Sequence, residues 1–206
     1  MQAIVLARRD FREYDQIISL YTKEKGKLEL LARGVKKITS KNSAHLEPFS
    51  VVDIDIAQGK EIDHLTKVQP VEYFKNIRND FQKSLVAQYV VSVTDKFMQV
   101  GERDERLFFS LKTWLEFLEM GNGKWEMGNL LDGFIVILLH CLGFSPSQNS
   151  KFVKWKTTLE ILESGNWDVI STLGFDAILH KKIHNFLEYH TERHVVDWEK
   201  TFVTVG

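Results

Sequence analysis

The sequence predicts an α+β protein, in which a small five-stranded barrel is followed by an all-helical C-terminal domain. Two observations lead to this prediction. Short apolar or alternating segments separated by turn residues fill residues 1–72, whereas after about residue 78 apolar residues recur at helical spacing. We therefore expect one domain at residues 1–78 and a second at residues 79–206.

Five short strands are expected in the first domain. The second and third flank a tight loop, in which Gly26 can adopt the positive φ that a hairpin turn favours. The fourth alternates apolar and acidic residues, the period-two pattern of a half-exposed strand, so Asp53 and Asp55 should face solvent. The OB-fold is the common barrel with five such strands. The expected strands are residues 3–7, 17–22, 28–32, 51–56 and 62–68.

Helices are expected throughout the second domain. Between residues 82 and 99, apolar side chains recur at every fourth position, which places them on one helix face. Asp104 is a suitable N-cap for a second helix, and Gly143 is a suitable end for a strongly apolar third helix. The expected helices are residues 82–99, 104–118, 130–142, 151–164 and 178–194.

The composition is that of an ordinary globular protein. Hydrophobic residues make up 44% and charged residues 27% of the 206 residues, which argues against a disordered chain. The longest apolar run, residues 134–139, is far shorter than the ~20 residues of a membrane span, and the N-terminus lacks the charge order of a secretory signal. Cys141, the single cysteine, excludes an internal disulfide framework. We expect a soluble, cytoplasmic protein with Cys141 as a buried packing residue.

Positive charge is concentrated near the N-terminus. Residues 1–45 contain ten bases and five acids, a net charge of +5, although the whole chain carries −1. Within this segment, residues 33–41 hold four bases, no acid, a glycine and two hydroxyl side chains. This combination suits contact with phosphates, which Lys and Arg neutralise. The alternative is a solvated loop, since runs of charge usually face water.

A second basic segment, residues 8–14, interleaves bases with Phe11 and Tyr14. Bases of this kind can contact phosphates while the aromatic rings stack on nucleobases. Alternatively, Phe11 and Tyr14 close the barrel end, and Glu13 and Asp15 pair with the arginines. The DNA-binding residues predicted from the basic N-terminal region are Arg8, Arg9, Arg12, Lys27, Arg33, Lys36, Lys37 and Lys41.

Several segments resemble, in the same order along the chain, the RecO family of bacterial DNA repair proteins. The most specific is the opening block at residues 3–37, which reads AIVLARRDFREYDQIISLYTKEKGKLELLARGVKK. It combines a strand, a basic-aromatic turn, a hairpin and a strand that ends in Ala-Arg-Gly. Shorter matches are Leu-Glu-Pro-Phe-Ser at residues 46–50, Leu-Gly-Phe-Ser-Pro at 142–146 and Phe-Leu-Glu-Tyr-His at 186–190.

The resemblance implies an OB-fold barrel, a helical C-terminal domain, no catalytic activity and no cofactor. It implies a nucleoid-associated recombination mediator that binds single- and double-stranded DNA, anneals complementary strands, and works with RecR and single-strand binding protein to load RecA. An apolar pocket with nearby lysines would accept the acidic, Phe-ended tail of single-strand binding protein. Many members carry a four-cysteine zinc motif after the Leu-Gly-Phe segment. No cysteine follows that segment here, so the chain resembles a zinc-free member.

Metal binding and catalysis find less support in the sequence. His180 and His184 are four residues apart, as are His190 and His194, so each pair could share a helix face. A zinc site needs further ligands, and we expect packing or surface roles for these histidines and no metal. No phosphate-cradling glycine motif, nucleophile elbow or two-metal carboxylate set is visible, which favours a protein that is not an enzyme. A protein-interaction scaffold without DNA affinity, built on the same barrel, is the alternative function. A metal-dependent nuclease is a third reading with no positive support.

Overall fold

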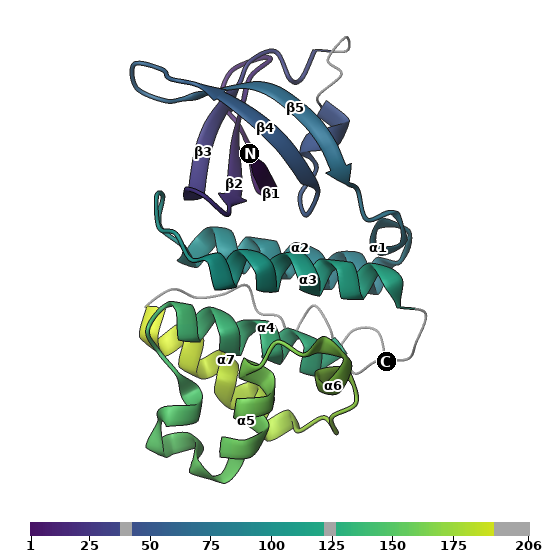
Figure 1. The fold of residues 1–206 in the computed structure, drawn as a ribbon, viewed down its shortest axis with the longest axis vertical. Helices are drawn as coiled ribbons and strands as arrows, with labels where there is room; N and C mark the ends of the chain where they lie inside the picture. The colour runs from purple at the N-terminus through teal and green to yellow at the C-terminus, as the bar shows by residue number, and fades with distance from the viewer. Residues whose placement is uncertain (38–42, 122–126, 192–206) are drawn as a thin grey trace. The chain divides into compact units, whose positions relative to one another are not determined.

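The computed structural model describes residues 1–37, 43–121 and 127–191 (Figure 1). The chain forms two compact units, Met1–Lys124 and Trp125–Gly206. The described part of the first contains a barrel and three α-helices, and the described part of the second is helical. The predicted division at residue 78 coincides with the change from strands to helices; as a boundary between domains it stays a prediction.

The N-terminal unit is built on five strands: β1 (Gln2–Asp10), β2 (Gln16–Thr22), β3 (Gly26–Ala32), β4 (Val51–Ala57) and β5 (His64–Glu72). They form a closed barrel in the order β1-β2-β3-β5-β4. Neighbouring strands pair antiparallel, except that β3 and β5 close the barrel through a parallel pair at Leu31 and His64. A short 3-10 helix, η1 (Ser43–Leu46), precedes β4. The predicted α+β class with an OB-fold barrel is confirmed.

Strand β4 follows the predicted alternation of buried and exposed residues. Asp53 and Asp55 are exposed on β4, as expected. Strand β1 is longer than predicted, because Arg8, Arg9 and Asp10 continue its pairing with β2. The core of the barrel consists of Ala3, Val5, Ile18, Leu20, Leu30, Ala32, Val35, Leu46, Val52 and Ile54.

The hairpin between β2 and β3 turns at Gly26, as predicted. Its φ is +66°, in the left-handed region that favours glycine. The position is also crowded, since a Cβ on Gly26 would lie 2.0 Å from the carbonyl oxygen of Glu102. A backbone hydrogen bond from Gly101 N to Lys27 O (2.8 Å) holds the hairpin against this later segment. The turn therefore requires glycine for two independent reasons.

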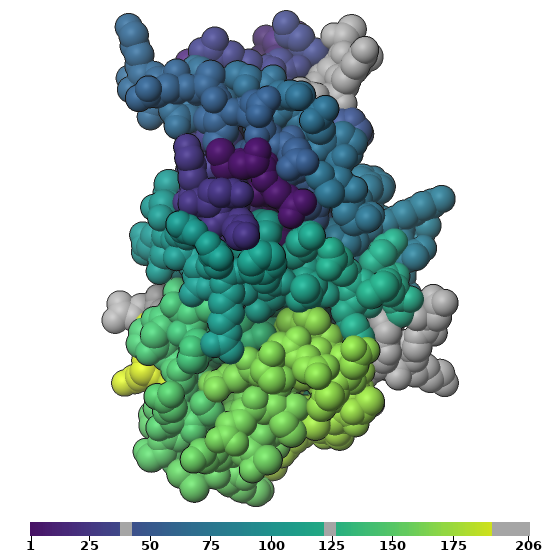
Figure 2. Space-filling model, in the orientation of Figure 1, coloured from purple at the N-terminus to yellow at the C-terminus, as the bar shows by residue number. Residues whose placement is uncertain are grey.

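Three helices complete the N-terminal unit: α1 (Lys75–Asn79), α2 (Phe81–Phe97) and α3 (Glu105–Met120). The short α1 was not predicted. The side chains of Asp80 and Asp104 cap α2 and α3 by accepting hydrogen bonds from the backbone N–H groups of Lys83 and Leu107. Helix α2 packs against β1. In the space-filling view, side chains of the teal helices lie directly against those of the purple first strands (Figure 2).

The C-terminal unit contains α4 (Met127–Cys141), η2 (Pro146–Gln148), η3 (Ser150–Trp155), α5 (Lys156–Glu163), α6 (Trp167–Ser171) and α7 (Ala177–Thr191). Helix α4 is its centre: residues 129–139 are all buried, and α5, α6 and α7 pack around them. Gly143, with a φ of +84°, follows the end of α4 as predicted. Cys141 is half-buried, so the prediction that it is a buried packing residue is wrong.

The remaining helix predictions for this unit hold with small adjustments. The segment predicted at residues 151–164 is divided into η3 and α5, and α6 is an addition. The last predicted helix corresponds to α7, and its residues 192–194 lie outside the described residues. Among the helices that the structure describes, none combines the length and the apolar character needed to cross a bilayer.

Candidate nucleic-acid interface

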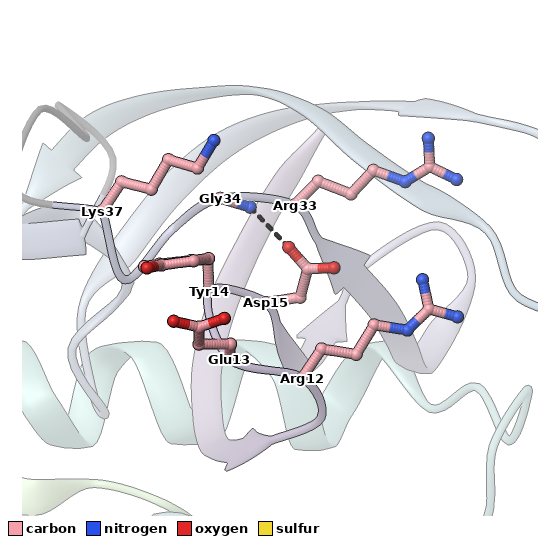
Figure 3. A pocket seen from close by; sticks show the side chains of 7 residues that line it. All are labelled: Arg12, Glu13, Tyr14, Asp15, Arg33, Gly34 and Lys37. Atoms are coloured by element: carbon pink, nitrogen blue, oxygen red, sulfur yellow. Dashed lines mark hydrogen bonds between the residues drawn. The ribbon is translucent and has the colours of Figure 1, made fainter.

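Two loops meet at one end of the barrel, the turn between β1 and β2 and the loop that follows β3 (Figure 3). The turn is closed by a hydrogen bond from Asp15 N to Arg12 O (3.3 Å), and the loop bends at Gly34, whose φ is +64°. The Asp15 carboxylate accepts a hydrogen bond from Gly34 N (2.7 Å), and Lys36 N donates to Tyr14 O (3.1 Å). These bonds fix the two loops against each other.

An open pocket of about 420 Å³ lies between the loops and carries three bases. Arg12 and Arg33 project to the same side, and Lys37 extends on the opposite side (Figure 3). Among the described residues, no ion pair joins any of these three bases to a carboxylate, so their charges remain available to an anion. The pocket is lined by Arg12, Glu13, Tyr14, Asp15, Arg33, Gly34 and Lys37.

Two aromatic rings accompany these bases. Phe11 is 47% and Tyr14 46% exposed, so the alternative in which they close the barrel end is wrong. The Arg12 guanidinium lies 5.0 Å from the centroid of the Phe11 ring, and the Lys37 ammonium lies 5.7 Å from that of Tyr14. The pKa of Tyr14 is raised, mainly because its hydroxyl is hydrogen-bonded to the Glu13 carboxylate. Both rings are therefore neutral, accessible and adjacent to a cation.

Lys36 and Arg33 contact different kinds of side chain. The Lys36 ammonium lies 2.8 Å from a carboxylate oxygen of Asp10, and this hydrogen bond is the main reason why the pKa of Asp10 is lowered. The Arg33 guanidinium instead lies 3.2 Å from Nε2 of His64, across the β3–β5 closure. Lys36 is thus partly neutralised by an acid, whereas Arg33 is positioned by a histidine.

The two arginines on β1 are paired with acids from other elements. Arg8 lies 2.8 Å from the carboxylate of Glu47, and Arg9 forms an ion pair with Glu29 on β3. The alternative in which Glu13 and Asp15 pair with these arginines is wrong, because those acids bind the Tyr14 hydroxyl and the Gly34 N–H. Exposed ion pairs contribute little energy, so a phosphate can compete for Arg9 more readily than for a buried base.

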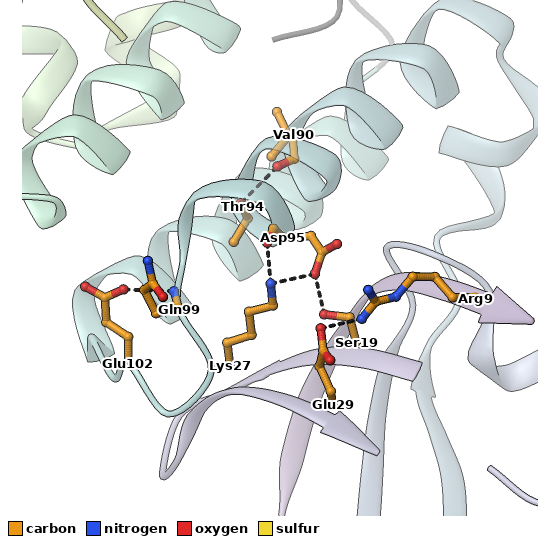
Figure 4. A network of polar contacts seen from close by, with 9 residues as sticks. All are labelled: Arg9, Ser19, Lys27, Glu29, Val90, Thr94, Asp95, Gln99 and Glu102. Carbon is orange, nitrogen blue, oxygen red and sulfur yellow. Dashed lines mark hydrogen bonds and ion pairs between the residues drawn. The ribbon is translucent and has the colours of Figure 1, made fainter. Parts of the chain in front are cut away.

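Lys27 does not belong to the exposed basic surface. Its side chain is buried, with Nζ 3.0 Å from a carboxylate oxygen of Asp95 and donating to the Asp95 carbonyl as well (Figure 4). The Ser19 hydroxyl donates to the same carboxylate. Strand β3 directs Lys27 toward α2, and its charge is used inside the N-terminal unit. This position takes Lys27 out of the candidate interface.

The sequence-predicted bases are therefore only partly brought together. Arg12, Arg33 and Lys37 line one pocket and Lys36 lies beside it, while Lys41 lies outside the described residues. The sequence analysis did not predict the anchoring role of Asp15. The signal that could have indicated it is an acid directly after the basic-aromatic segment at residues 8–14. The sequence analysis also missed His64, which no local pattern marks, because its contact with Arg33 depends on closure of the barrel.

A second pocket, of about 310 Å³, lies in the C-terminal unit between η3 and α7. The rings of Phe152 and Phe186 pack edge to face in it, with centroids 5.3 Å apart. The Lys151 ammonium lies 5.4 Å from the centroid of the exposed Tyr189 ring, and Lys182 lines the same pocket. An aromatic floor with two lysines suits an aromatic residue that carries a carboxylate. The family resemblance implied such a pocket, but the sequence did not indicate its residues.

Comparison with known proteins agrees with the fold. The family "Recombination protein O N terminal" matches residues 1–74, and "Recombination protein O C terminal" matches residues 78–159. The chain is 34% identical over 146 residues to the DNA repair protein RecO of Desulforamulus reducens, and 34% identical over 145 residues to that of Dehalococcoides mccartyi. These matches cover 71% and 70% of this chain but 56% of each relative, so the matched region spans little more than half of their length. The chain belongs to the RecO family of DNA repair proteins.

Proposed function

We propose that the chain is a non-catalytic recombination mediator that binds single- and double-stranded DNA, anneals complementary strands and assists RecA loading together with RecR and single-strand binding protein. The observation that carries the proposal is the pocket at the barrel end, where Arg12, Arg33 and Lys37 stand beside two exposed rings. Membership of a DNA repair family supports DNA as the ligand. OB-fold barrels also commonly use their loops and one sheet face to bind nucleic acids.

The chemistry of the pocket suits the nucleic-acid backbone more than a particular base sequence. Three bases would neutralise phosphates and release counterions, which supplies affinity without reading the bases. Phe11 and Tyr14 would stack on bases, a contact worth about 1–3 kcal/mol per base and tolerant of sequence. A strand held in this way keeps its pairing edges free and repels a second strand less. These two properties are what strand annealing requires.

The aromatic pocket of the C-terminal unit is the proposed site for the acidic tail of single-strand binding protein. The terminal Phe of the tail would pack against the floor that Phe152 and Phe186 form together, and its carboxylates would meet Lys151 and Lys182. The charge-reversing variant Lys151→Glu plus Lys182→Glu should abolish binding of a tail peptide while leaving DNA binding unchanged. Loss of both activities, or of neither, would contradict this assignment.

Fluorescence anisotropy of a labelled 30-nucleotide single strand, titrated at several salt concentrations, tests the DNA-binding proposal. If the three bases each neutralise one phosphate, the logarithm of the association constant should fall with that of salt with a slope of about −2. Addition of the unlabelled complement should then show faster annealing than in buffer alone. A matched control is Lys25→Glu plus Lys75→Glu, which reverses two exposed charges where β2 and β5 end, away from the pocket.

A protein-interaction scaffold on the same barrel is the second candidate function. The observation that favours it is the pairing of Arg8, Arg9 and Lys36 with acids, which leaves fewer available charges than the sequence indicates. The salt series separates the two candidates. Absence of DNA binding at the lowest salt concentration would leave the scaffold as the better description.

A further inference from the structure

Three ionisable side chains meet inside the C-terminal unit, far along the chain from the basic pocket. Asp132 lies on α4, and His180 and His184 lie one turn apart on α7. All three are buried, with exposed fractions of 3%, 4% and 7%. Nδ1 of His180 lies 2.5 Å and Nε2 of His184 lies 3.6 Å from the same oxygen of Asp132. The two imidazole rings are 4.5 Å apart between centroids.

The apolar surroundings of these three side chains make their burial energetically unfavourable unless a bound group compensates for it. Helix α4 is apolar on nearly all sides, and Leu131 and Gly133 beside Asp132 are both buried. Burial of a carboxylate is unfavourable unless a positive partner or several donors compensate it. An apolar residue at position 132 would complete the packing of α4 without that cost. The presence of a carboxylate at position 132 is therefore best explained by a positively charged group that it binds.

The donor set is that of a transition-metal site. Two imidazoles and one carboxylate are ligands that zinc accepts, and a water molecule would complete the tetrahedral set of four. Magnesium and calcium prefer oxygen ligands alone, so two nitrogens disfavour them. Two histidines four residues apart on a helix present their nitrogens on one face, which is a recurrent arrangement for zinc.

The geometry is close to what a metal needs. One potential ligand atom from each of the three residues lies within 4.8 Å of the others. A zinc ion sits about 2.0–2.2 Å from each ligand, which sets ligand atoms roughly 3–4 Å apart. The separation between Asp132 and His184 already falls in this range. The contact between Asp132 and His180 would have to widen by roughly 1 Å, a shift within reach of side-chain rotation.

We propose that Asp132, His180 and His184 form a site for one divalent transition-metal ion of the zinc type, which links α4 to α7. The ion would lie between the carboxylate and the two imidazoles, and its charge would compensate the buried Asp132. Its role would be structural, since all three ligands are buried and none of them lines the pocket between η3 and α7. The proposal is independent of DNA binding.

Titration of the tag-free 206-residue chain with Co²⁺ tests the site directly. The protein is first treated with a chelator and dialysed, and visible absorption is then recorded as Co²⁺ is added. We expect ligand-field bands that saturate at one equivalent and disappear when Zn²⁺ is added. Thermal unfolding should shift upward by several degrees with one equivalent of Zn²⁺ relative to the chelator-treated protein.

Two variants and a matched control assign the ligands. His184→Gln and Asp132→Asn should each weaken Co²⁺ binding by at least 10-fold. His190→Gln, on the same helix, removes the other histidine pair of that sequence segment and should leave the bands unchanged. Circular dichroism shows whether each variant is folded, and the wild-type titration stands even if one is not.

Several outcomes would overturn the proposal. Absence of saturating Co²⁺ bands and of any Zn²⁺-dependent thermal shift in the wild-type chain would leave a metal-free ion pair. Loss of the bands in His190→Gln, with both buried variants binding normally, would instead place the metal on the other histidine pair.

Discussion

Bases on the strands and bases on the loops of the barrel have different fates, although they are equally prominent in the sequence. Arg8 and Arg9 on β1 and Lys27 on β3 are each held by an acid from elsewhere in the N-terminal unit. Arg12 and Arg33, at the loops, line an open pocket without a carboxylate partner among the described residues. Lys36, which pairs with Asp10, is the exception among the loop bases. A strand lies between neighbours that can supply acids, whereas a loop at the barrel end faces water. The difference shows that a count of positive charges overstates the size of a nucleic-acid interface.

The largest expected effect comes from the strand base that is buried. Lys27→Met should lower the free energy of unfolding by about 2–3 kcal/mol, because it leaves the Asp95 carboxylate without its cation. Urea unfolding measures this change, and DNA affinity per folded molecule should stay the same. The double variant Lys27→Met plus Asp95→Asn should cost less than the sum of the two single variants. Normal stability together with lost DNA binding would return Lys27 to the interface.

The loop bases should control affinity without affecting stability. Arg33→Glu plus Lys37→Glu should weaken single-strand binding by more than 10-fold and reduce the magnitude of the salt slope by about 1.4, because two phosphate contacts are lost. Unfolding in urea should be unchanged within about 0.5 kcal/mol, since both side chains are at the surface. Anisotropy titration against the Lys25→Glu plus Lys75→Glu control measures the effect. Equal loss in the control would mean that net charge, and not this pocket, governs binding.

The bond between the two loops should affect both properties moderately. Asp15→Ala removes the acceptor of the Gly34 N–H, which should destabilise the unit by about 1 kcal/mol and weaken DNA binding a few-fold as the bases lose their fixed spacing. Asp15→Asn keeps an acceptor oxygen and should restore most of the stability. If removing this acid strengthens DNA binding, its charge matters more than its hydrogen bond.

The smallest effect should come from releasing a paired base. Asp10→Asn frees Lys36 and should strengthen DNA binding about twofold at low salt. The pKa of Asp10 in the folded protein is lowered below its ordinary value near 3.8. The stabilisation from its pair with Lys36 is therefore fully present above that ordinary value, and it is lost only as pH falls through the still lower pKa of the folded state. The ratio of the two affinities should therefore be constant between pH 5.5 and pH 8. A ratio that varies over this range would assign the effect to another group.

The sequence was informative wherever local patterns decide structure. The alternation at residues 51–56 placed β4 (Val51–Ala57), and the apolar run at residues 130–142 placed α4. Asp104 and Gly26 were identified because a helix cap and a tight turn each demand particular residues. The short helices α1 and α6 were not predicted, because one turn of helix contains too few residues to show a hydrophobic period.

What the sequence could not give was pairing across the fold. The partners of Arg8, Arg9 and Lys27 come from the loop after η1, from β3 and from α2, and no spacing in the sequence indicates these pairings. The meeting of Asp132 with the histidines of α7 is of the same kind, since the acid belongs to another helix. Such contacts arise from tertiary packing. A DNA-binding base that is predicted from composition must therefore still be checked in the structure for an acidic partner.

The pairing of the strand bases also has a kinetic consequence. Seen from beyond one Debye length, about 8–10 Å at physiological salt, an ion pair is a weak dipole whose field fades much faster than that of a single charge. Of the predicted DNA-binding bases that the structure describes, a polyanion diffusing toward the barrel would therefore sense chiefly Arg12, Arg33 and Lys37. These three bases would steer the encounter of the polyanion with a chain whose net charge is −1. The association rate should then fall with salt more steeply than the dissociation rate rises.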